Sequence, residues 1–182
     1  MNQTATAQPR MIYIVGYPGS GKTTVMEKAV EGLGFSLEDK PFKHTVYENA
    51  AVQLGYARET YGGTDGLSLN VQPKVAEWLT ECGAALVIAE GDRLANTKFF
   101  ETVQKIGWNL QVVHLKVSEI TAYRRAWKRG SQFDGKWMRG RITKVNNLVS
   151  KWGESILTLD GNEPVEELAM VIKGKMEGGY AG

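Results

Sequence analysis

The sequence predicts an α/β protein in which a parallel sheet of about five strands lies between two layers of helices. Short apolar runs alternate with segments of helical periodicity along the chain, as parallel strands with helical crossovers require. One run, residues 84–89, contains no polar side chain, which is typical of a central strand covered on both faces. Another, residues 11–15, leads directly into a glycine-rich loop and then a helix.

This loop, residues 16–23, matches the pattern G-x-x-x-x-G-K-[ST] at every position. Residues 11–15 are rich in β-branched and aromatic types, which predicts a buried strand, and residues 24–33 place apolar side chains on one side of a helix. Strand, loop and helix in this order are the context of a phosphate-binding P-loop. The chain is therefore expected to have the three-layer α/β/α P-loop nucleoside triphosphate hydrolase fold.

A P-loop predicts a nucleoside triphosphate, here ATP, and Mg²⁺ as the ligands. Glycines let successive backbone N–H groups turn toward phosphate oxygens, and the helix that follows adds positive potential. Lys22 is expected to reach the β- and γ-phosphates, and the Thr23 hydroxyl to bind Mg²⁺. The expected nucleotide-binding residues are Gly16, Gly19, Ser20, Gly21, Lys22, Thr23 and Thr24.

The next segment predicts a strand over residues 43–47, a helix of weak periodicity over residues 48–58, and then a loop. The loop combines glycines with an arginine, tyrosines and a carboxylate, and flexible backbone with such side chains suits ligand binding. Arg58, Thr64 and Asp65 are therefore expected to contact a substrate.

An acidic turn follows the apolar run 84–89, with the sequence Glu90-Gly91-Asp92-Arg93. Carboxylates at the end of a strand beside the P-loop strand stand in a Walker-B-like position. Asp92 is expected to support Mg²⁺ behind Thr23, although Glu90 could also hold a metal-bound water. Either Asp65 or Glu90 could orient or deprotonate an acceptor hydroxyl, and Arg93 could bind the acceptor.

The remaining elements continue the alternation of helices and strands. Helices are expected at 70–81 with Asn70 as the cap, 94–106, 118–129 with Ser118 as the cap, 137–152, and 163–176 after Asn162; strands are expected at 110–117 and 156–160. Residues 11–177 then form one domain after a flexible tail, residues 1–10.

Basic residues gather between residues 123 and 144, where eight lysines and arginines face a single acidic residue. A helix, a polar loop and a second helix with this charge predict an Arg-rich lid over residues 124–141, which would stabilise transition-state charge. Arg125 and Arg129 are expected to do so from one helix face. Trp127 is expected in the core, whereas Phe133 and Trp137 are expected to stack on a base, with Arg141 near the acceptor.

Composition excludes several classes of protein. No apolar run approaches the length of about 20 residues that a membrane span needs. The single cysteine, Cys82, cannot form an internal disulfide and fits a reducing cytoplasm. No cluster of cysteine and histidine suggests zinc.

Four segments in order resemble the small phage-encoded P-loop kinases related to nucleoside and nucleotide kinases, and most of all the 5-hydroxymethyluracil DNA kinases. These segments are residues 16–23, residues 63–66 through 71–74, residues 89–94, and residues 140–145 with Asn147 and Leu148. The resemblance implies ATP-dependent phosphorylation of the hydroxymethyl group of a modified pyrimidine within phage DNA, as a step toward thymidine hypermodification.

Two other readings remain open at this point. A free nucleoside or nucleoside monophosphate kinase would need the same lid charges. A non-catalytic nucleotide-binding switch, or an NTPase partner protein, would need the P-loop but neither the lid nor the loop at residues 58–66.

Overall fold

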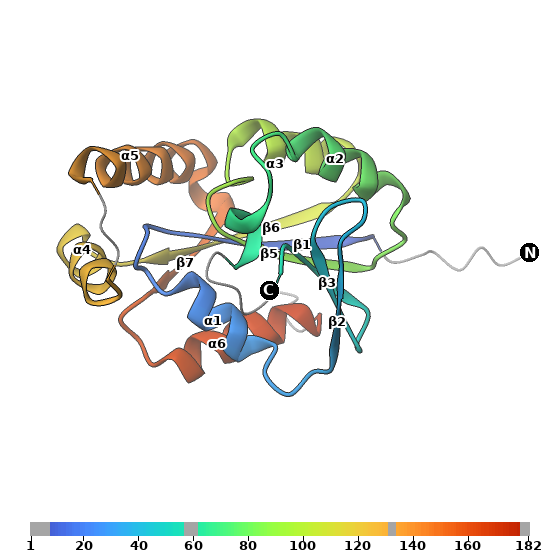
Figure 1. Cartoon of the computed structure of the whole chain (residues 1–182), viewed down its shortest axis with the longest axis horizontal. Helices are drawn as coiled ribbons and strands as arrows, with labels where there is room; N and C mark the ends of the chain where they lie inside the picture. Colours follow the sequence, from blue (N-terminus) through green and yellow to red (C-terminus); the bar gives the residue numbers. More distant parts are fainter. Residues whose placement is uncertain (1–7, 57–61, 131–133, 179–182) are drawn as a thin grey trace, which may run out of the picture.

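The computed structural model describes residues 8–56, 62–130 and 134–178. Seven strands form one sheet in the order β2-β3-β4-β5-β1-β6-β7. The strands are Arg10–Val15 (β1), Phe35–Glu38 (β2), His44–Tyr47 (β3), Ala51–Leu54 (β4), Leu86–Glu90 (β5), Asn109–Lys116 (β6) and Ile156–Asp160 (β7). β1 lies between β5 and β6, so the P-loop leaves the middle of the parallel part of the sheet (Figure 1).

Five neighbouring strands, β4-β5-β1-β6-β7, are parallel, which confirms the predicted sheet. The strand predicted at residues 43–47 exists, but it pairs antiparallel with β4 and extends the sheet beyond the parallel part. The helix predicted at residues 48–58 is wrong, because residues 51–54 form β4 and are all buried. A short run buried on both faces lacks the alternation that identifies a strand in sequence.

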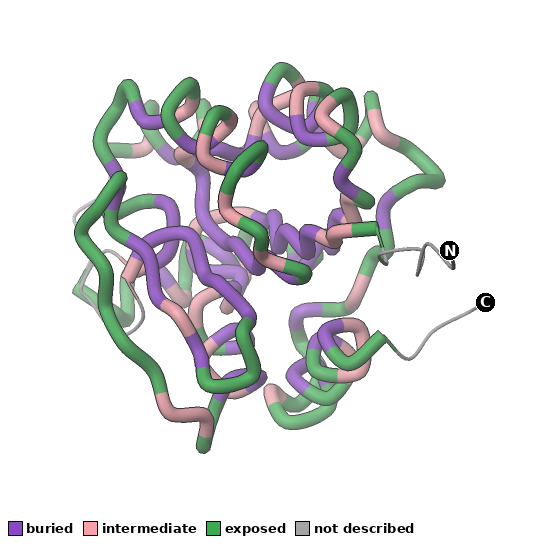
Figure 2. Tube along the Cα trace, turned by 90° about the vertical axis from the view of Figure 1, so that its right-hand side faces the viewer, coloured by how far each residue is buried: buried purple, intermediate pink, exposed green. Residues whose placement is uncertain are grey.

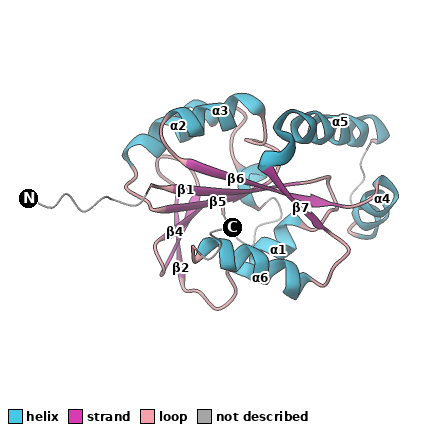
Figure 3. Ribbon diagram, turned by 180° about the vertical axis from the view of Figure 1, so that it is seen from behind, coloured by secondary structure: helices cyan, strands magenta, loops and turns pink. Residues whose placement is uncertain are grey.

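Two layers of helices cover the sheet (Figures 1 and 3). Helices Gln72–Glu81 (α2) and Thr97–Lys105 (α3) pack on one face together with the C-terminal part of Gly135–Trp152 (α5). Helices Lys22–Ala29 (α1) and Val165–Met176 (α6) pack on the other face. Buried residues follow the middle of the sheet, as the tube in Figure 2 shows.

Helix Glu119–Lys128 (α4) forms a third, smaller cluster with the start of α5, built on Ala122, Ala126 and Met138. Ser118 caps α4 as predicted, since its side chain accepts a hydrogen bond from the Thr121 N–H. Trp127 was expected in the core, but it is 81% exposed. The buried stripe of α4 consists of small alanines, which leaves the tryptophan on the outer face.

Several boundaries differ from those predicted. α3 is capped by Asn96, α5 by Asp134, and α2 and α6 begin after Val71 and Pro164 rather than at Asn70 and Asn162. Arg10 belongs to β1 rather than to a tail, and its guanidinium donates to the carbonyls of Lys175 and Met176. Among the helices described, none has both the length and the apolarity needed to cross a membrane.

Candidate active site

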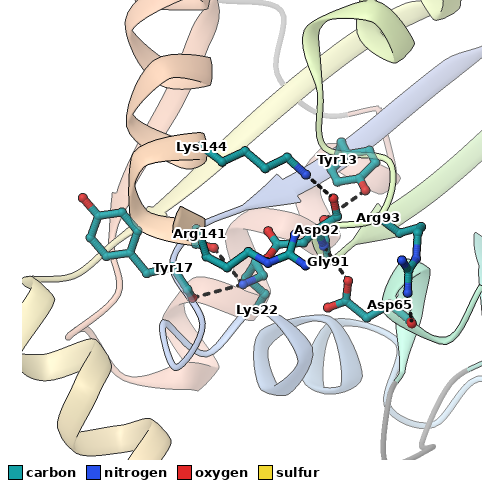
Figure 4. Close-up of polar contacts among 10 residues, drawn as sticks. Tyr13, Tyr17, Lys22, Asp65, Gly91, Asp92, Arg93, Arg141 and Lys144 are labelled. Carbon is teal, nitrogen blue, oxygen red and sulfur yellow. Dashed lines mark hydrogen bonds and ion pairs between the residues drawn. The ribbon is translucent and has the colours of Figure 1, made fainter. Parts of the chain in front are cut away.

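The P-loop leaves the end of β1 and wraps the start of α1 (Figure 4). The Lys22 ammonium donates hydrogen bonds to the carbonyls of Gly16 and Tyr17, at 2.8 and 3.1 Å. These bonds hold the lysine across its own loop, so its charge is already positioned where phosphate oxygens would bind. Ser20 is buried, whereas Thr24 lies exposed one turn further along.

Glu90 ends β5 beside the P-loop and is almost completely buried. Its Oε1 accepts a hydrogen bond from the Thr23 hydroxyl at 3.2 Å. Burial raises the pKa of Glu90 to about 7, and although Lys22 opposes this rise, the nearby Asp65 adds to it. Glu90 rather than Asp92 is therefore the carboxylate behind Thr23.

This hydroxyl and carboxylate fit Mg²⁺, which proteins hold through one or two carboxylates while substrate phosphates and water complete its shell. Among the residues described, no group of three or more His, Cys, Asp and Glu side chains could hold a metal ion by themselves. The ion would therefore need the nucleotide as well as Thr23 and Glu90.

Two buried hydroxyl groups hold the turn after β5 by hydrogen bonds to its carbonyls. Tyr13 on β1 donates to the Gly91 carbonyl at 3.0 Å, and Thr64 donates to the Glu90 carbonyl at 2.9 Å. Gly91 has φ +106°, and a Cβ there would lie 2.8 Å from the Thr64 hydroxyl. Thr64 is thus a buried support of the turn, and not a residue that faces a substrate as the sequence had predicted.

Asp65 joins the loop around residues 63–66 to the acidic turn. It lies in the short helix Gly63–Gly66 (η1), and its Oδ1 accepts a hydrogen bond from the Asp92 N–H at 2.8 Å. The Arg93 guanidinium donates to the Asp65 carbonyl at 3.3 Å. Asp65 is exposed although Gly63 and Thr64 before it are buried, so its carboxylate can meet a ligand at this edge of the sheet.

Helix α5 closes this group from above (Figure 4). Arg141 Nε lies 3.6 Å from Asp92 Oδ2, and the Lys144 ammonium donates to the Asp92 carbonyl at 2.5 Å. The Arg141 guanidinium also lies over the Trp137 ring, 5.2 Å from its centroid. Burial lowers the pKa of Lys144, while Asp92 opposes that change.

A cavity of about 370 Å³ adjoins the P-loop between α4 and the start of α6. Gly19, Gly21 and Thr24 line it from the P-loop side, Arg125 lines it from α4, and Arg129 lines it from the cap at the end of α4. None of the acceptor-side residues Asp65, Asp92 and Arg93 lines it, so it is a separate compartment.

Arg125 spans the wall of this cavity. Its guanidinium donates to the carbonyls of Ser20 and Gly161, at 3.4 and 2.9 Å, and to Asn162 Oδ1 at 3.3 Å. The side chain therefore ties the P-loop to the loop between β7 and α6.

The structure brings most of the predicted site together. Lys22, Thr23, Glu90, Asp65, Asp92, Arg93 and Arg141 lie in one connected group. Arg58 and Phe133 lie outside the described residues. Sequence reasoning missed Tyr13, whose only signal was a polar atom within an apolar run, and Lys144, which was counted in the basic segment but given no role.

Fold and site together define a P-loop phosphotransferase. The chain belongs to the family described as P-loop Nucleotide Kinase3, whose model matches residues 7–158. No curated protein matches the chain.

Solved structures support the fold. A sugar kinase from Janibacter sp. HTCC2649 is 17% identical with a TM-score of 0.56, and the match covers 93% of this chain and 95% of that one. A gluconokinase from Sinorhizobium meliloti 1021 is 20% identical with a TM-score of 0.52, over 95% and 97%. A deoxyadenosine kinase from M. mycoides with bound dATP is 13% identical with a TM-score of 0.50, over 91% and 98%.

Proposed function

We propose that the protein is an ATP- and Mg²⁺-dependent kinase that phosphorylates a hydroxyl of a pyrimidine acceptor. The observation that carries this proposal is the connection between two groups of residues. Thr23 of the P-loop bonds to Glu90, and two residues later the Asp92 N–H bonds to Asp65, an exposed residue. Donor-side and acceptor-side carboxylates are thereby held by one short turn, as phosphoryl transfer between two bound substrates requires.

In this proposal each side chain has a separate task. Lys22 and the P-loop N–H groups bind the phosphates and stabilise the charge that develops on the transferring oxygens. Thr23 and Glu90 hold Mg²⁺, which neutralises phosphate charge when bound. Asp65 orients the acceptor hydroxyl and accepts its proton. The bond from the γ-phosphorus to the β-phosphate oxygen breaks, a bond to the acceptor oxygen forms, and ADP leaves.

Two further regions are assigned to the two substrates, one to ATP and the other to the acceptor. The cavity lined by Arg125 and Arg129 is assigned to the nucleoside part of ATP, because it adjoins the P-loop and lacks the acceptor-side carboxylates. We assign the acceptor to Arg93, Arg141 and Trp137. The two guanidinium groups would bind negatively charged groups of the acceptor, and the ring would stack on its base. Arg58 is assigned to the same substrate on sequence alone.

The preferred acceptor is the 5-hydroxymethyl group of 5-hydroxymethyluracil in phage DNA. This choice rests on the resemblance of residues 63–66, 89–94 and 140–145, which fall on η1, on the acidic turn and on α5. The protein would then act in the cytoplasm of a host cell. A free nucleoside or nucleoside monophosphate is the second candidate, which the nucleotide-kinase description of the family favours.

The test is transfer of label from γ-labelled ATP, with Mg²⁺, to two kinds of acceptor. One is DNA that contains 5-hydroxymethyluracil, with thymine DNA as its control, and the other is a panel of free nucleosides and nucleoside monophosphates. We expect label on the modified DNA alone. Label on a free nucleotide alone would establish the second candidate, and ATP hydrolysis that no acceptor stimulates would indicate a nucleotide-dependent switch.

A further inference from the structure

A second cavity, of about 480 Å³, lies between the start of α3 and the middle of α5. Residues 95–97 line it on one side, and a single stripe of α5 lines the other. The stripe consists of Gly140, Thr143, Lys144, Asn147 and Lys151, with Leu148 beside it. No P-loop residue lines this cavity, so it is distinct from the one assigned to ATP.

The cavity adjoins the acceptor side of the site. Lys144 belongs to both, because it lines the cavity and its ammonium donates to the Asp92 carbonyl. Arg141, which follows Gly140 in sequence, pairs with the Asp92 carboxylate. A ligand that reaches from Asp92 along α5 would therefore enter the cavity.

Gly140 is a costly residue that the fold does not require. Glycine inside a helix is about 1 kcal/mol less favourable than alanine. A Cβ at this position would meet no atom within 4 Å, and the backbone there is that of an ordinary helix. Because packing does not demand glycine, we attribute it to the close approach of a ligand to the bare backbone.

The rest of the stripe offers hydrogen-bond donors and positive charge. Thr143 and Asn147 supply a hydroxyl and an amide, and Lys144 and Lys151 supply ammonium groups. No carboxylate lines the cavity, but the charge of Asp92 acts on Lys144, and Glu101 pairs with Lys151 at 3.0 Å in an exposed contact. Exposed pairs contribute little, so an anion can compete for this lysine.

We propose that this cavity binds the nucleotide that flanks the acceptor in a polynucleotide, chiefly through its phosphodiester group. The proposal rests on the proposed function and deepens it, because it assigns the neighbouring nucleotide of a polymer acceptor to a place in the fold. Cavities of this size hold small ligands of nucleotide scale. A free mononucleotide in the acceptor site would leave this cavity without a ligand.

The test compares the binding of two probes, the monophosphate of 5-hydroxymethyldeoxyuridine and a trinucleotide with that residue in the middle. The variants are Gly140→Phe, which fills the cavity, Gly140→Ala, which adds only a methyl group, and Lys151→Gln. Lys173→Gln makes the same charge change at an exposed position on α6, on the opposite face of the sheet.

We expect the wild type to bind the trinucleotide at least about tenfold more tightly than the monophosphate, a difference of about 1.4 kcal/mol. Gly140→Ala should keep only part of that advantage, because its methyl group enters the space that the ligand approaches. Gly140→Phe should lose that advantage and bind the monophosphate as before. Lys151→Gln should lower the slope of log affinity against log salt by about 0.7, as the loss of one phosphate contact to a single strand predicts. Lys173→Gln should change neither quantity.

Equal binding of the two probes by the wild type would overturn the proposal, and so would a folded Gly140→Phe variant that keeps the advantage. Thermal unfolding of Gly140→Phe, compared with that of Gly140→Ala, shows whether the larger variant folds. If it does not fold, the salt dependence of trinucleotide binding by Lys151→Gln decides whether the proposal stands. If Gly140→Phe transfers phosphate to a free nucleotide as well as the wild type does, and the wild type binds the two probes equally, the role of this cavity is rejected. The proposed kinase activity is then retained. Absence of transfer to every acceptor would reject the kinase, and the binding data would still decide the cavity.

Discussion

The Thr23 hydroxyl donates a hydrogen bond to Glu90 Oε1 across 3.2 Å, and this bond joins the P-loop to the neighbouring strand of the sheet. Parallel pairing places Ile14 of β1 opposite Glu90 of β5, so the loop that follows β1 starts beside this carboxylate. Two residues that are 67 positions apart thereby form one site. The predictions below follow from this connection and from its neighbours.

Replacement of Lys22 by alanine should reduce phosphoryl transfer by about 10²–10³-fold, because a charged donor to the transferring oxygens is lost. The fold should survive, since the hydrogen bonds that Lys22 makes to the described residues go to carbonyls of its own loop, which water can satisfy. Steady-state kinetics and thermal unfolding measure the two effects. Lys28→Ala, in the same helix but in an exposed pair with Glu31, is the control and should remain active.

Glu90→Gln should stabilise the ligand-free protein at high pH. The folded pKa of about 7 lies above that of an unfolded glutamate, so the wild type loses stability as pH rises from about 5 to about 7. Glutamine removes this loss, and the variant should be more stable at pH 8 by up to about 3 kcal/mol, with little difference near pH 4. Urea unfolding at both pH values measures it; equal stability at pH 8 would contradict the buried charge.

The same Glu90→Gln substitution should impair transfer, because the carboxylate assigned to Mg²⁺ is removed. We expect the Mg²⁺ concentration that gives half-maximal activity to rise in the variant. In the wild type this concentration should fall as pH rises through about 7, since the ion competes with the proton on Glu90. A Mg²⁺ requirement that is independent of pH in the wild type would count against this assignment.

Asp65→Asn should lower kcat on the order of 10²-fold with little change in the KM for the acceptor, as expected for loss of a general base. The amide oxygen can still accept the Asp92 N–H, so the turn should keep its shape. Asp65→Ala loses that bond as well and serves as the comparison. A rise in acceptor KM at unchanged kcat would make Asp65 a binding residue instead.

Arg125→Ala should raise the KM for ATP about tenfold or more and leave the KM for the acceptor unchanged. The guanidinium holds the Ser20 and Gly161 carbonyls on two sides of the cavity beside the P-loop, and each such bond contributes about 1.5–3 kcal/mol. Arg124→Ala, at the exposed neighbouring position, is the matched control. If both substitutions raised the KM for ATP equally, the positive charge of α4, and not the hydrogen bonds of Arg125, would account for the effect.

Local motifs allowed much of the fold to be predicted, because the P-loop and the apolar run at residues 84–89 each define a strand and its neighbours. Residues 51–54 were misassigned because they are buried on both faces, and no period distinguishes such a strand from a short helix. The position of Trp127 depends on which side of α4 is covered. The covered side is set by tertiary packing, which helical periodicity alone does not predict.

The site was predicted as a set of residues but not as a set of contacts. Sequence placed Glu90 and Asp92 at one strand end, and only the turn at Gly91, with φ +106°, directs the first toward Thr23 and the second toward Arg141. Thr64 looked like a ligand contact because it lies in a glycine-rich loop. Its burial against Tyr13 depends on the packing of η1 onto β5, which no local pattern reveals.

The central position of β1 has a consequence for synthesis on the ribosome. This strand is translated before its partners β5 and β6, and α1 packs on α6, the last described helix. Arg10 also binds the carbonyls of Lys175 and Met176 at the end of α6. A nascent chain therefore carries a complete P-loop motif before the sheet and helices that shape it have formed, and we expect it to bind nucleotide only after α6 has left the exit tunnel.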